Sequence, residues 1–362
     1  MNDTLQDMMR EATQLTQAGH LAEATELIQR ALGGSKAPAA SPQQAAATAP
    51  FVIDGIVLNR HVEGDVSNTD DARDDSSGDF ISGSHTHAGL TRNYKLYVPP
   101  QHAGRALPLV VMLHGCTQNP DDFAAGTDMN ARAREQGFFV LYPAQSQEGN
   151  AQRCWNWFAR AHQQRGSGEP ALLADMTQAV TKTYGIDAQR VYVAGLSAGG
   201  AMADIVAAAY PEIYAAVGVH SGLPRGAATN VAGAFAAMKN GEPSSRSTAI
   251  LNEATVPTIV FHGDQDQTVH PKNGEQVIAT LLRAVAASEP TVEQGVAMAG
   301  RRYTRSTFRD LGGDTVAEHW RIEGAGHAWS GGSAKGTYTD VRGPDATAEM
   351  LRFFFDHPLR VR

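Results

Sequence analysis

The sequence predicts an α/β protein in which helices cover both faces of a mostly parallel sheet. Short apolar runs recur along the chain from residue 91 onward, at 94–98, 109–113, 138–143, 191–196, 215–220 and 258–263. Helical patterns separate them, at 121–136, 171–184, 198–209 and 273–286, and a closing helix is expected at 345–356. Continuous apolar strands that alternate with helices are typical of a parallel sheet buried on both faces. Because ligands bind beyond the carboxyl ends of such strands, we expect functional residues directly after them.

Composition excludes several classes of protein. Hydrophobic residues make up 42% of the 362 residues and charged residues 19%, which is enough for a large core. A formal net charge of −8 argues against a surface that tracks phosphates, so we expect no nucleic-acid partner. No run of apolar residues approaches the length of a membrane span, so we expect no transmembrane segment.

The start of the chain and its two cysteines bear on where the protein works. The first thirty residues lack the pattern of a secretory signal, so we expect a cytoplasmic protein. Cys116 and Cys154 have two interpretations: buried small hydrophobic residues, or a disulfide, because both lie beside candidate active-site segments. A cytoplasmic location favours free thiols.

Four regions are predicted along the chain. Residues 1–33 carry two amphipathic runs broken at Gly19 and predict a helical hairpin, either a simple extension or a docking element. Residues 34–50 are rich in Ala and Pro and predict a flexible linker. Residues 51–90 predict a strand and a polar, acidic loop that lead into the core, and 91–358 form the α/β domain.

Ser197 is the candidate nucleophile. It lies in Gly195-Leu196-Ser197-Ala198-Gly199, directly after an apolar strand and before an Ala-rich helix. This is the G-x-S-x-G elbow, in which small neighbours permit a tight, strained turn that exposes the serine hydroxyl. A lone motif of this kind is weak in a chain with 36 glycines, but its place between strand and helix strengthens it.

A serine hydroxyl needs a base to take its proton and an acid to orient that base. The strand at 258–263 is followed by Asp264 and Asp266, of which Asp266 is the better placed acid and Asp264 the competitor. His327 lies later, in the Gly-rich segment Gly324-Ala325-Gly326-His327. The chain order Ser, Asp, His is that of the α/β-hydrolase fold.

An oxyanion hole requires two backbone N–H groups. We expect Ala198 N–H to supply one and Cys116 N–H, in the loop after the strand at 109–113, to supply the other. Cys116 is a poor candidate nucleophile because it has no elbow and would leave Ser197 unexplained.

Aromatic residues near these segments are candidates for a substrate wall, with core packing the even alternative. They are Trp155, Trp157 and Trp329. His85 and His87 stand two apart without further ligands nearby in sequence, and no dinucleotide or Walker motif is present, so we expect neither a metal nor a cofactor.

Together these segments resemble the catalytic domain of polyhydroxybutyrate (PHB) depolymerases and of the related acetylxylan and feruloyl esterases. The matching pieces, in the family's order, are YKLYVP, LVVMLHGCTQ, CWNWF, VYVAGLSAGGAM, HGDQDQTV and GAGHAWSGG. The resemblance covers residues 91–358 and places the family's triad on Ser197, Asp266 and His327. Its oxyanion positions fall on Cys116 and Ala198.

The resemblance implies a serine esterase that hydrolyses poly(3-hydroxybutyrate) or its oligomers through an acyl-enzyme. Secreted depolymerases carry a signal peptide and a C-terminal polymer-binding domain, which this sequence lacks, so it resembles the intracellular enzymes that act on polyester granules. Two alternatives remain: a feruloyl, acetylxylan or small-ester carboxylesterase, and a granule-binding protein whose hydrolase fold is inert.

Overall fold

The computed structural model describes residues 51–53, 56–59, 78–241 and 255–360. The hairpin predicted at 1–33 and the linker predicted at 34–50 lie outside these residues. None of the described helices is long and apolar enough to cross a membrane.

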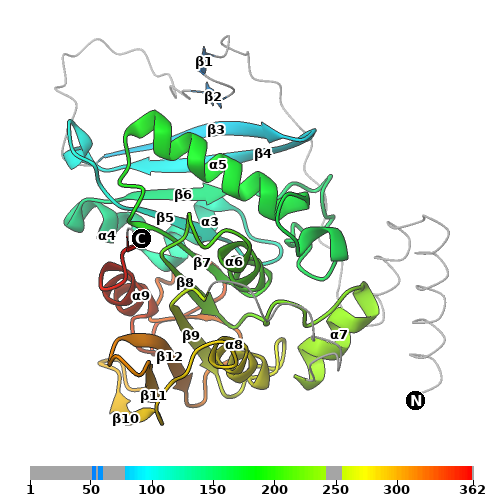
Figure 1. The fold of residues 1–362 in the computed structure, drawn as a ribbon, viewed down its shortest axis with the longest axis vertical. Helices are drawn as coiled ribbons and strands as arrows, with labels where there is room; N and C mark the ends of the chain where they lie inside the picture. Colours follow the sequence, from blue (N-terminus) through cyan, green and yellow to red (C-terminus); the bar gives the residue numbers. More distant parts are fainter. Residues whose placement is uncertain (1–50, 54–55, 60–77, 242–254, 361–362) are drawn as a thin grey trace. The chain divides into compact units, whose positions relative to one another are not determined.

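Twelve of the described strands form one sheet, with its parallel strands in the middle (Figure 1). The order is β1-β2-β3-β4-β6-β5-β7-β8-β9-β12-β11-β10, and every pair from β6 to β12 is parallel. Antiparallel hairpins extend the sheet at both ends. The strands are β1 (Phe51–Ile53), β2 (Ile56–Asn59), β3 (Asp79–His87), β4 (Leu90–Val98), β5 (Leu109–Leu113), β6 (Phe139–Pro143), β7 (Val191–Leu196), β8 (Ala216–His220), β9 (Thr258–Gly263), β10 (Thr291–Val296), β11 (Arg302–Arg309) and β12 (Thr315–Ile322). A separate short pair joins β13 (Trp329–Ser330) to β14 (Thr339–Asp340).

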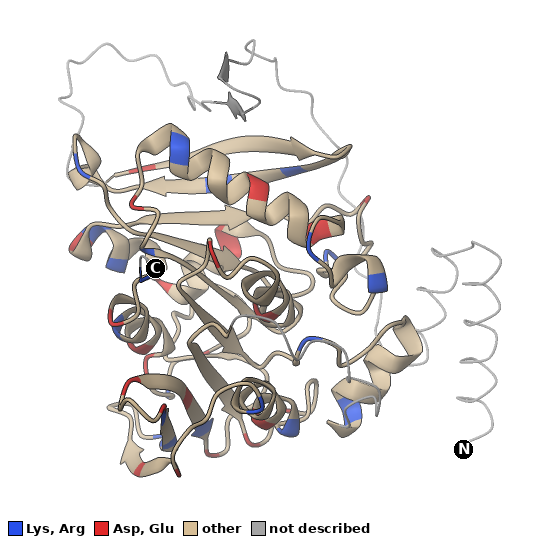
Figure 2. Ribbon diagram, viewed as in Figure 1, with Lys and Arg blue, Asp and Glu red and all other residues tan. Residues whose placement is uncertain are grey.

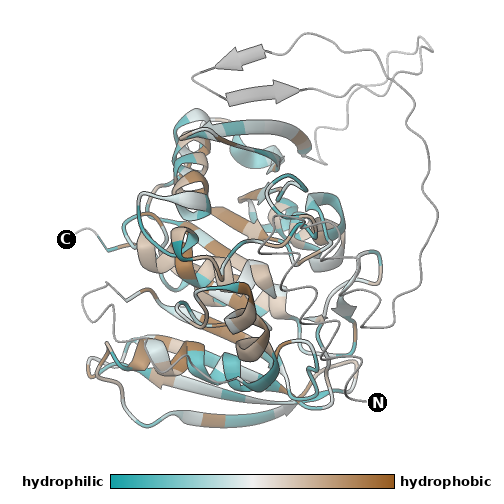
Figure 3. Ribbon diagram, turned by 90° about the vertical axis from the view of Figure 1, so that its right-hand side faces the viewer, coloured by the Kyte–Doolittle hydropathy of each residue, from teal (hydrophilic) through white to brown (hydrophobic). Residues whose placement is uncertain are grey.

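The central strands form where apolar residues run without interruption. Every residue of β5, β6, β7, β8 and β9 is buried, and none of these strands contains a charged residue (Figure 2). Hydropathy colouring likewise marks the central strands as the most apolar part of the sheet (Figure 3). This burial on both faces confirms the fold class predicted from the sequence.

Helices cover the sheet as two layers, each with its own apolar cluster. One cluster includes residues of α5, α6, α7 and α8, and the other includes residues of α3, α4 and α9. The helices are α3 (Pro120–Thr127), α4 (Met129–Gln136), α5 (Gly168–Tyr184), α6 (Ala198–Ala209), α7 (Val231–Asn240), α8 (Lys272–Leu282) and α9 (Ala346–Phe355), with 3₁₀ turns at η1 (Pro100–His102) and η2 (Arg160–His162).

Three features depart from the sequence prediction. Strand β3 occupies the later part of 51–90, where a polar, acidic loop was expected. The helix expected at 121–136 is two helices, because Asp128 adopts a left-handed conformation (φ 54°) that ends α3 and precedes α4. The strands β10, β11 and β12 and the helix α7 were not predicted. Strand β12 matters for function, because it lies beside β9 and leads into the segment that carries His327.

Candidate active site

Ser197 occupies a strained turn between β7 and α6. Its φ of 58° and ψ of −120° are unusual for a residue with a side chain. The turn requires the glycines that lie two residues away on either side. A Cβ on Gly199 would lie 2.0 Å from the Leu113 carbonyl oxygen, and one on Gly195 would lie 2.3 Å from the Gly199 backbone. The G-x-S-x-G pattern is therefore a steric requirement, and it fixes Ser197 at the carboxyl end of β7.

Two backbone N–H groups beside Ser197 have no acceptor among the described residues. They belong to Ala198, at the N-terminus of α6, and to Cys116, in the loop after β5. A helix N-terminus favours negative charge, and unpaired N–H groups are what a developing oxyanion requires. Both groups are those expected from the sequence to form an oxyanion hole, and that role stays a prediction.

The loop after β5 is held by its own hydrogen bonds. Gly115 N–H donates to Gln118 Oε1 at 2.9 Å. Thr117 has a φ of 67°, and its N–H donates to the Gln152 carbonyl at 2.7 Å. His114 Nδ1 donates to the Gly115 carbonyl at 2.8 Å while its Nε2 accepts from Gln145 N–H at 3.1 Å, and burial lowers the pKa of its ring to about 4. A neutral His114 therefore supports the loop.

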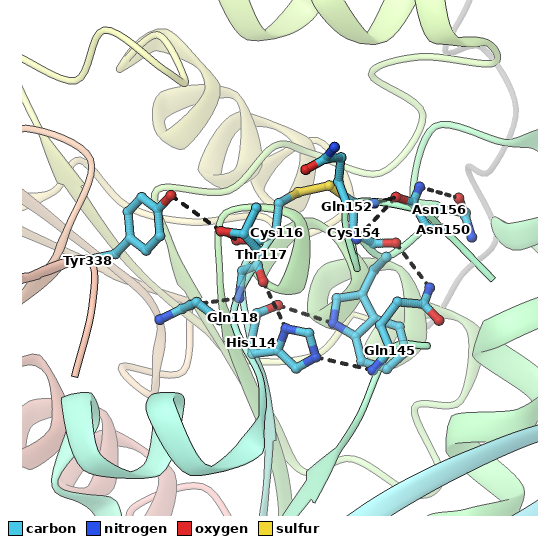
Figure 4. Close-up of a disulfide and its surroundings, with 12 residues drawn as sticks. His114, Cys116, Thr117, Gln118, Gln145, Asn150, Gln152, Cys154, Asn156 and Tyr338 are labelled. Carbon is cyan, nitrogen blue, oxygen red and sulfur yellow. Dashed lines mark hydrogen bonds between the residues drawn. A yellow bond between two sulfur atoms is a disulfide. The ribbon is translucent and has the colours of Figure 1, made fainter. Parts of the chain in front are cut away.

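A disulfide ties this loop to the next one. Cys116 and Cys154, 38 residues apart in sequence, are bonded (Figure 4). Trp155 Nε1 adds a second link by donating to the His114 carbonyl at 3.1 Å. Of the two interpretations left open by the sequence, the structure shows the disulfide. The backbone that carries the Cys116 N–H is thus held by the disulfide and by the hydrogen bond from Trp155 to His114.

Asp266 accepts hydrogen bonds from its own turn and from His327. Thr268 N–H and Val269 N–H donate to Oδ1 at 2.9 and 2.8 Å, and His327 Nδ1 lies 2.7 Å from Oδ2. Burial by itself would raise the pKa of Asp266, but its histidine and backbone hydrogen bonds outweigh burial and lower that pKa. The carboxylate is therefore ionised and holds the proton of His327 on Nδ1, which leaves Nε2 free to act as a base.

Sequence reasoning missed a second histidine at this carboxylate. His262, the penultimate residue of β9, places Nε2 at 2.8 Å from the Val269 carbonyl and 3.4 Å from Asp266 Oδ2. Because both partners are acceptors, this nitrogen carries the proton. The four-residue spacing to Asp266 was the available signal. Asp264 instead accepts Gly324 N–H at 2.7 Å, so of the two candidate acids only Asp266 contacts His327.

His220 links the serine to the histidine segment. Its carbonyl accepts Ser197 N–H at 2.9 Å, and its Nε2 accepts Ser330 N–H at 2.9 Å, three residues after His327. Burial lowers the pKa of its ring well below the usual value, so it stays neutral. The structure thus brings Ser197, Asp266 and His327 to one end of the sheet. Among the described residues no hydrogen bond joins the Ser197 hydroxyl to His327, a contact that often tightens only when substrate binds.

The three tryptophans proposed as a substrate wall are buried. Trp155, Trp157 and Trp329 are at most 4% exposed. Trp329 donates from Nε1 to Thr347 and stacks on His220. They pack beneath the site, as in the core-packing alternative.

Tyr338 reaches the site without having been predicted. Its hydroxyl lies 3.4 Å from Thr117 Oγ1 (Figure 4). Its ring centroid lies 6.5 Å from that of His327. Its sequence context, a polar Gly-rich segment, gives no signal for such a position.

No group of three or more His, Cys, Asp or Glu side chains within the described ranges is arranged to hold a metal ion. His85 and His87 both contact Asp175 of α5, at 2.7 and 3.1 Å, and so join β3 to that helix.

Comparisons with known proteins agree on one family. The profile described as esterase PHB depolymerase matches residues 92–301. Poly(3-hydroxyalkanoate) depolymerase C of Paucimonas lemoignei is 30% identical over 257 residues, which cover 68% of this chain and 60% of that protein. Acetylxylan esterase A of Aspergillus oryzae is 28% identical over 200 residues, 51% of this chain and 64% of that one. The chain thus spans about three fifths of the length of the curated relatives it matches.

Solved structures support the fold. An acetyl xylan esterase from Aspergillus awamori has a TM-score of 0.56 at 20% identity and covers 73% of this chain and 94% of its own. An S-formylglutathione hydrolase from Agrobacterium tumefaciens has a TM-score of 0.51 at 14% identity and covers 77% and 96%. At these identities the likeness concerns the fold alone.

Proposed function

The chain belongs to the esterase PHB depolymerase family, and from this membership we propose that it hydrolyses ester bonds of poly(3-hydroxybutyrate) or its oligomers, with Ser197, His327 and Asp266 as its catalytic triad. One observation carries the proposal. The His327–Asp266 hydrogen bond forms at the same end of the sheet as the Ser197 elbow, with two unpaired N–H groups beside the serine.

In the first half-reaction, the Ser197 hydroxyl attacks the ester carbonyl carbon while His327 Nε2 takes the hydroxyl proton. The carbonyl oxygen becomes an oxyanion and accepts hydrogen bonds from Cys116 N–H and Ala198 N–H. When the tetrahedral intermediate collapses, the bond to the alcohol oxygen breaks. His327 gives its proton to that oxygen, and the acyl group stays on Ser197.

In the second half-reaction, water repeats the attack. His327 takes a proton from the water as its oxygen bonds to the acyl carbon, and the same two N–H groups receive the oxyanion. Collapse releases the carboxylic acid and returns the proton to Ser197. Asp266 keeps the tautomer of His327 fixed and stabilises the imidazolium that forms in each half-reaction.

The polyester substrate is supported by the relative of highest identity reported above, a poly(3-hydroxyalkanoate) depolymerase. The acetylxylan esterases favour a second candidate, removal of short acyl groups from a polysaccharide, with the same catalytic groups. The two differ in what they release: 3-hydroxybutyrate units or acetate.

The test uses the purified full chain with amorphous poly(3-hydroxybutyrate) and, separately, acetylated xylan. We expect granule turbidity to fall and 3-hydroxybutyrate oligomers to appear. Ser197→Ala should lower this rate by at least about four orders of magnitude. Ser288→Ala, an exposed serine beside the β10–β11 end of the sheet, is the matched control and should keep full activity. Retained activity in Ser197→Ala would refute the triad, and acetate release without polyester turnover would favour the second candidate.

A granule partner and the cytoplasmic location stay predictions. The Cys116–Cys154 disulfide is of a type found mainly in oxidising compartments, which weighs against the cytoplasm. Titration of free thiols in protein taken directly from its native cells, together with fractionation, tests the location. Deletion of residues 1–50 tests granule docking, because unchanged association would exclude that role for the hairpin.

A further inference from the structure

Tyr338 lies between the two halves of the candidate site and is itself 47% exposed. On one side its hydroxyl approaches Thr117, which directly follows the oxyanion donor Cys116. On the other side its ring meets the His327 ring edge to face, with an interplanar angle of 81°. An exposed aromatic ring between the oxyanion loop and the candidate base is positioned to contact a substrate.

The backbone at Tyr338 is held in an unfavourable conformation to place this ring. Its φ is 52°, a left-handed conformation that residues with a side chain adopt at an energetic cost. Trp329 N–H donates to its carbonyl at 2.7 Å. The preceding Thr337 donates from its N–H and its hydroxyl to Asp122, at 2.8 and 2.5 Å. The surrounding contacts therefore fix the strained residue.

Close packing before Tyr338 leaves no freedom to relax the strain. A Cβ on Gly336 would lie 2.4 Å from the backbone nitrogen of Gly126, so the segment lies directly on α3. Other strained residues with side chains gather here as well. Seven residues other than glycine have a positive φ in the described part of the chain. Besides Tyr338 they include Ser197, Thr117 and Arg153, which directly precedes Cys154. Such strain concentrates at functional sites.

We propose that the Tyr338 ring binds the alcohol portion of the ester and so determines which leaving groups the enzyme accepts. This inference rests on the proposed triad. His327 gives its proton to the leaving oxygen, so a group beside His327 flanks the alcohol and not the acyl chain. The contact with Thr117 places the same ring beside the oxyanion. The ring thus lies between the leaving oxygen and the oxyanion, where the apolar part of the substrate that it can contact is the carbon skeleton of the alcohol.

This placement has a kinetic consequence. The alcohol departs when the acyl-enzyme forms, so Tyr338 acts on acylation and has no substrate group to contact during deacylation. Two esters of one acid give the same acyl-enzyme, whatever their alcohols. A structural role for Tyr338, through Thr117 or His327, would instead alter both half-reactions and all esters alike.

The test compares ethyl butyrate with 2-phenylethyl butyrate, whose alcohols differ in size while the acyl group is the same. We expect Tyr338→Ala to lower kcat/KM for 2-phenylethyl butyrate by about tenfold and for ethyl butyrate by less than about twofold. Tyr338→Phe should keep most of the wild-type kcat/KM for 2-phenylethyl butyrate, because the ring remains. Val341→Ala removes an exposed side chain from the same segment and is the matched control. Stopped-flow measurement of deacylation should give the same rate in all variants.

Equal losses for both esters, a changed deacylation rate, or no loss with either ester would each overturn the assignment of Tyr338. These results are separate from a failure of the proposed function. If Ser197→Ala hydrolyses both butyrates at the normal rate, the triad is wrong. If Ser197→Ala is inactive while Tyr338→Ala keeps the preference for the larger alcohol, only the assignment of Tyr338 fails.

Discussion

Removal of the Cys116–Cys154 disulfide should destabilise the protein and slow it at the same time. The double substitution Cys116→Ser and Cys154→Ser keeps side chains of similar size and leaves both backbone N–H groups in place. With a sequence separation of 38 between the cysteines, the loop-closure entropy that the crosslink removes from the unfolded chain corresponds to about 4 kcal/mol at 25 °C. This is a large share of the stability of a typical domain.

The expected effect on catalysis is smaller than the loss of an oxyanion donor. Losing one donor outright slows a serine protease by about 100- to 1,000-fold. Here the loop keeps the Thr117 N–H bond to Gln152 and the Trp155 bond to His114, so Cys116 N–H is displaced but not removed. We therefore expect kcat to fall by about tenfold.

Equilibrium unfolding in urea measures the first effect, and hydrolysis of p-nitrophenyl butyrate measures the second. Reductant should shift the wild type toward the double variant and leave the double variant unchanged. A double variant with wild-type unfolding free energy would refute the entropic argument. Wild-type kcat would show that the other bonds alone hold the oxyanion loop.

Three further predictions concern the acid, the buried histidines and the elbow. Asp266→Asn should lower kcat by about 10⁴-fold, because His327 would lose its correct tautomer. His262→Leu should lower kcat by about tenfold, because the carboxylate would lose one hydrogen bond. Equal values of kcat for His262→Leu and the wild type would show that His262 does not support the site. The pKa of His114 falls from 6.5 to about 4 on folding, so between these values the unfolded chain binds a proton that the folded chain excludes. Lowering the pH from 7 to 5 should cost about 2 kcal/mol of unfolding free energy at this residue. In His114→Gln, the decrease in unfolding free energy from pH 7 to pH 5 should be smaller by about 2 kcal/mol, as measured by urea titrations at both pH values. Gly199→Ala should fail to fold or melt far below the wild type, because its Cβ would meet the Leu113 carbonyl. Gly326→Ala, where the added carbon meets nothing within 4 Å, should melt within about 2 °C of the wild type.

The centre of the fold was predictable because an uninterrupted apolar run marks each central strand. The bounds of β5, β7, β9 and α6 in the structure are those expected from the apolar runs and the helical pattern. A strand buried on both faces has no polar positions to obscure its limits. The order of Ser197, Asp266 and His327 along the chain was equally informative, because it is that of the α/β-hydrolase fold and the first two residues follow predicted strands.

The edge of the sheet was not predictable in the same way. Five of the six residues of β10 are exposed, so the strand lacks the alternation that burial of one face would impose. The break at Asp128 carried only a weak signal, since Gly126 lies two residues before it but the residue in the left-handed conformation is an aspartate. For both, distant parts of the chain override local preference.

The parts of the site that were missed depend on contacts between distant segments. His262 lies at the end of a buried strand, where a histidine has many possible partners, and only the turn to Asp266 gives it one. Tyr338 meets Thr117 across 221 residues of sequence. The indole rings of Trp155, Trp157 and Trp329 carried no mark to tell a cleft wall from a core, and their burial became visible only in the structure.

The position of β12 between β9 and β11 has a consequence for synthesis of the protein on the ribosome. Strand β12 pairs with β9 and leads into the segment whose His327 contacts Asp266. A nascent chain of 300 residues would hold the proposed nucleophile and acid but not the proposed base, so we expect it to be unable to cleave an ester. With the proposed triad, we therefore expect hydrolysis to begin only after residue 327 has left the exit tunnel and its segment has reached Asp266.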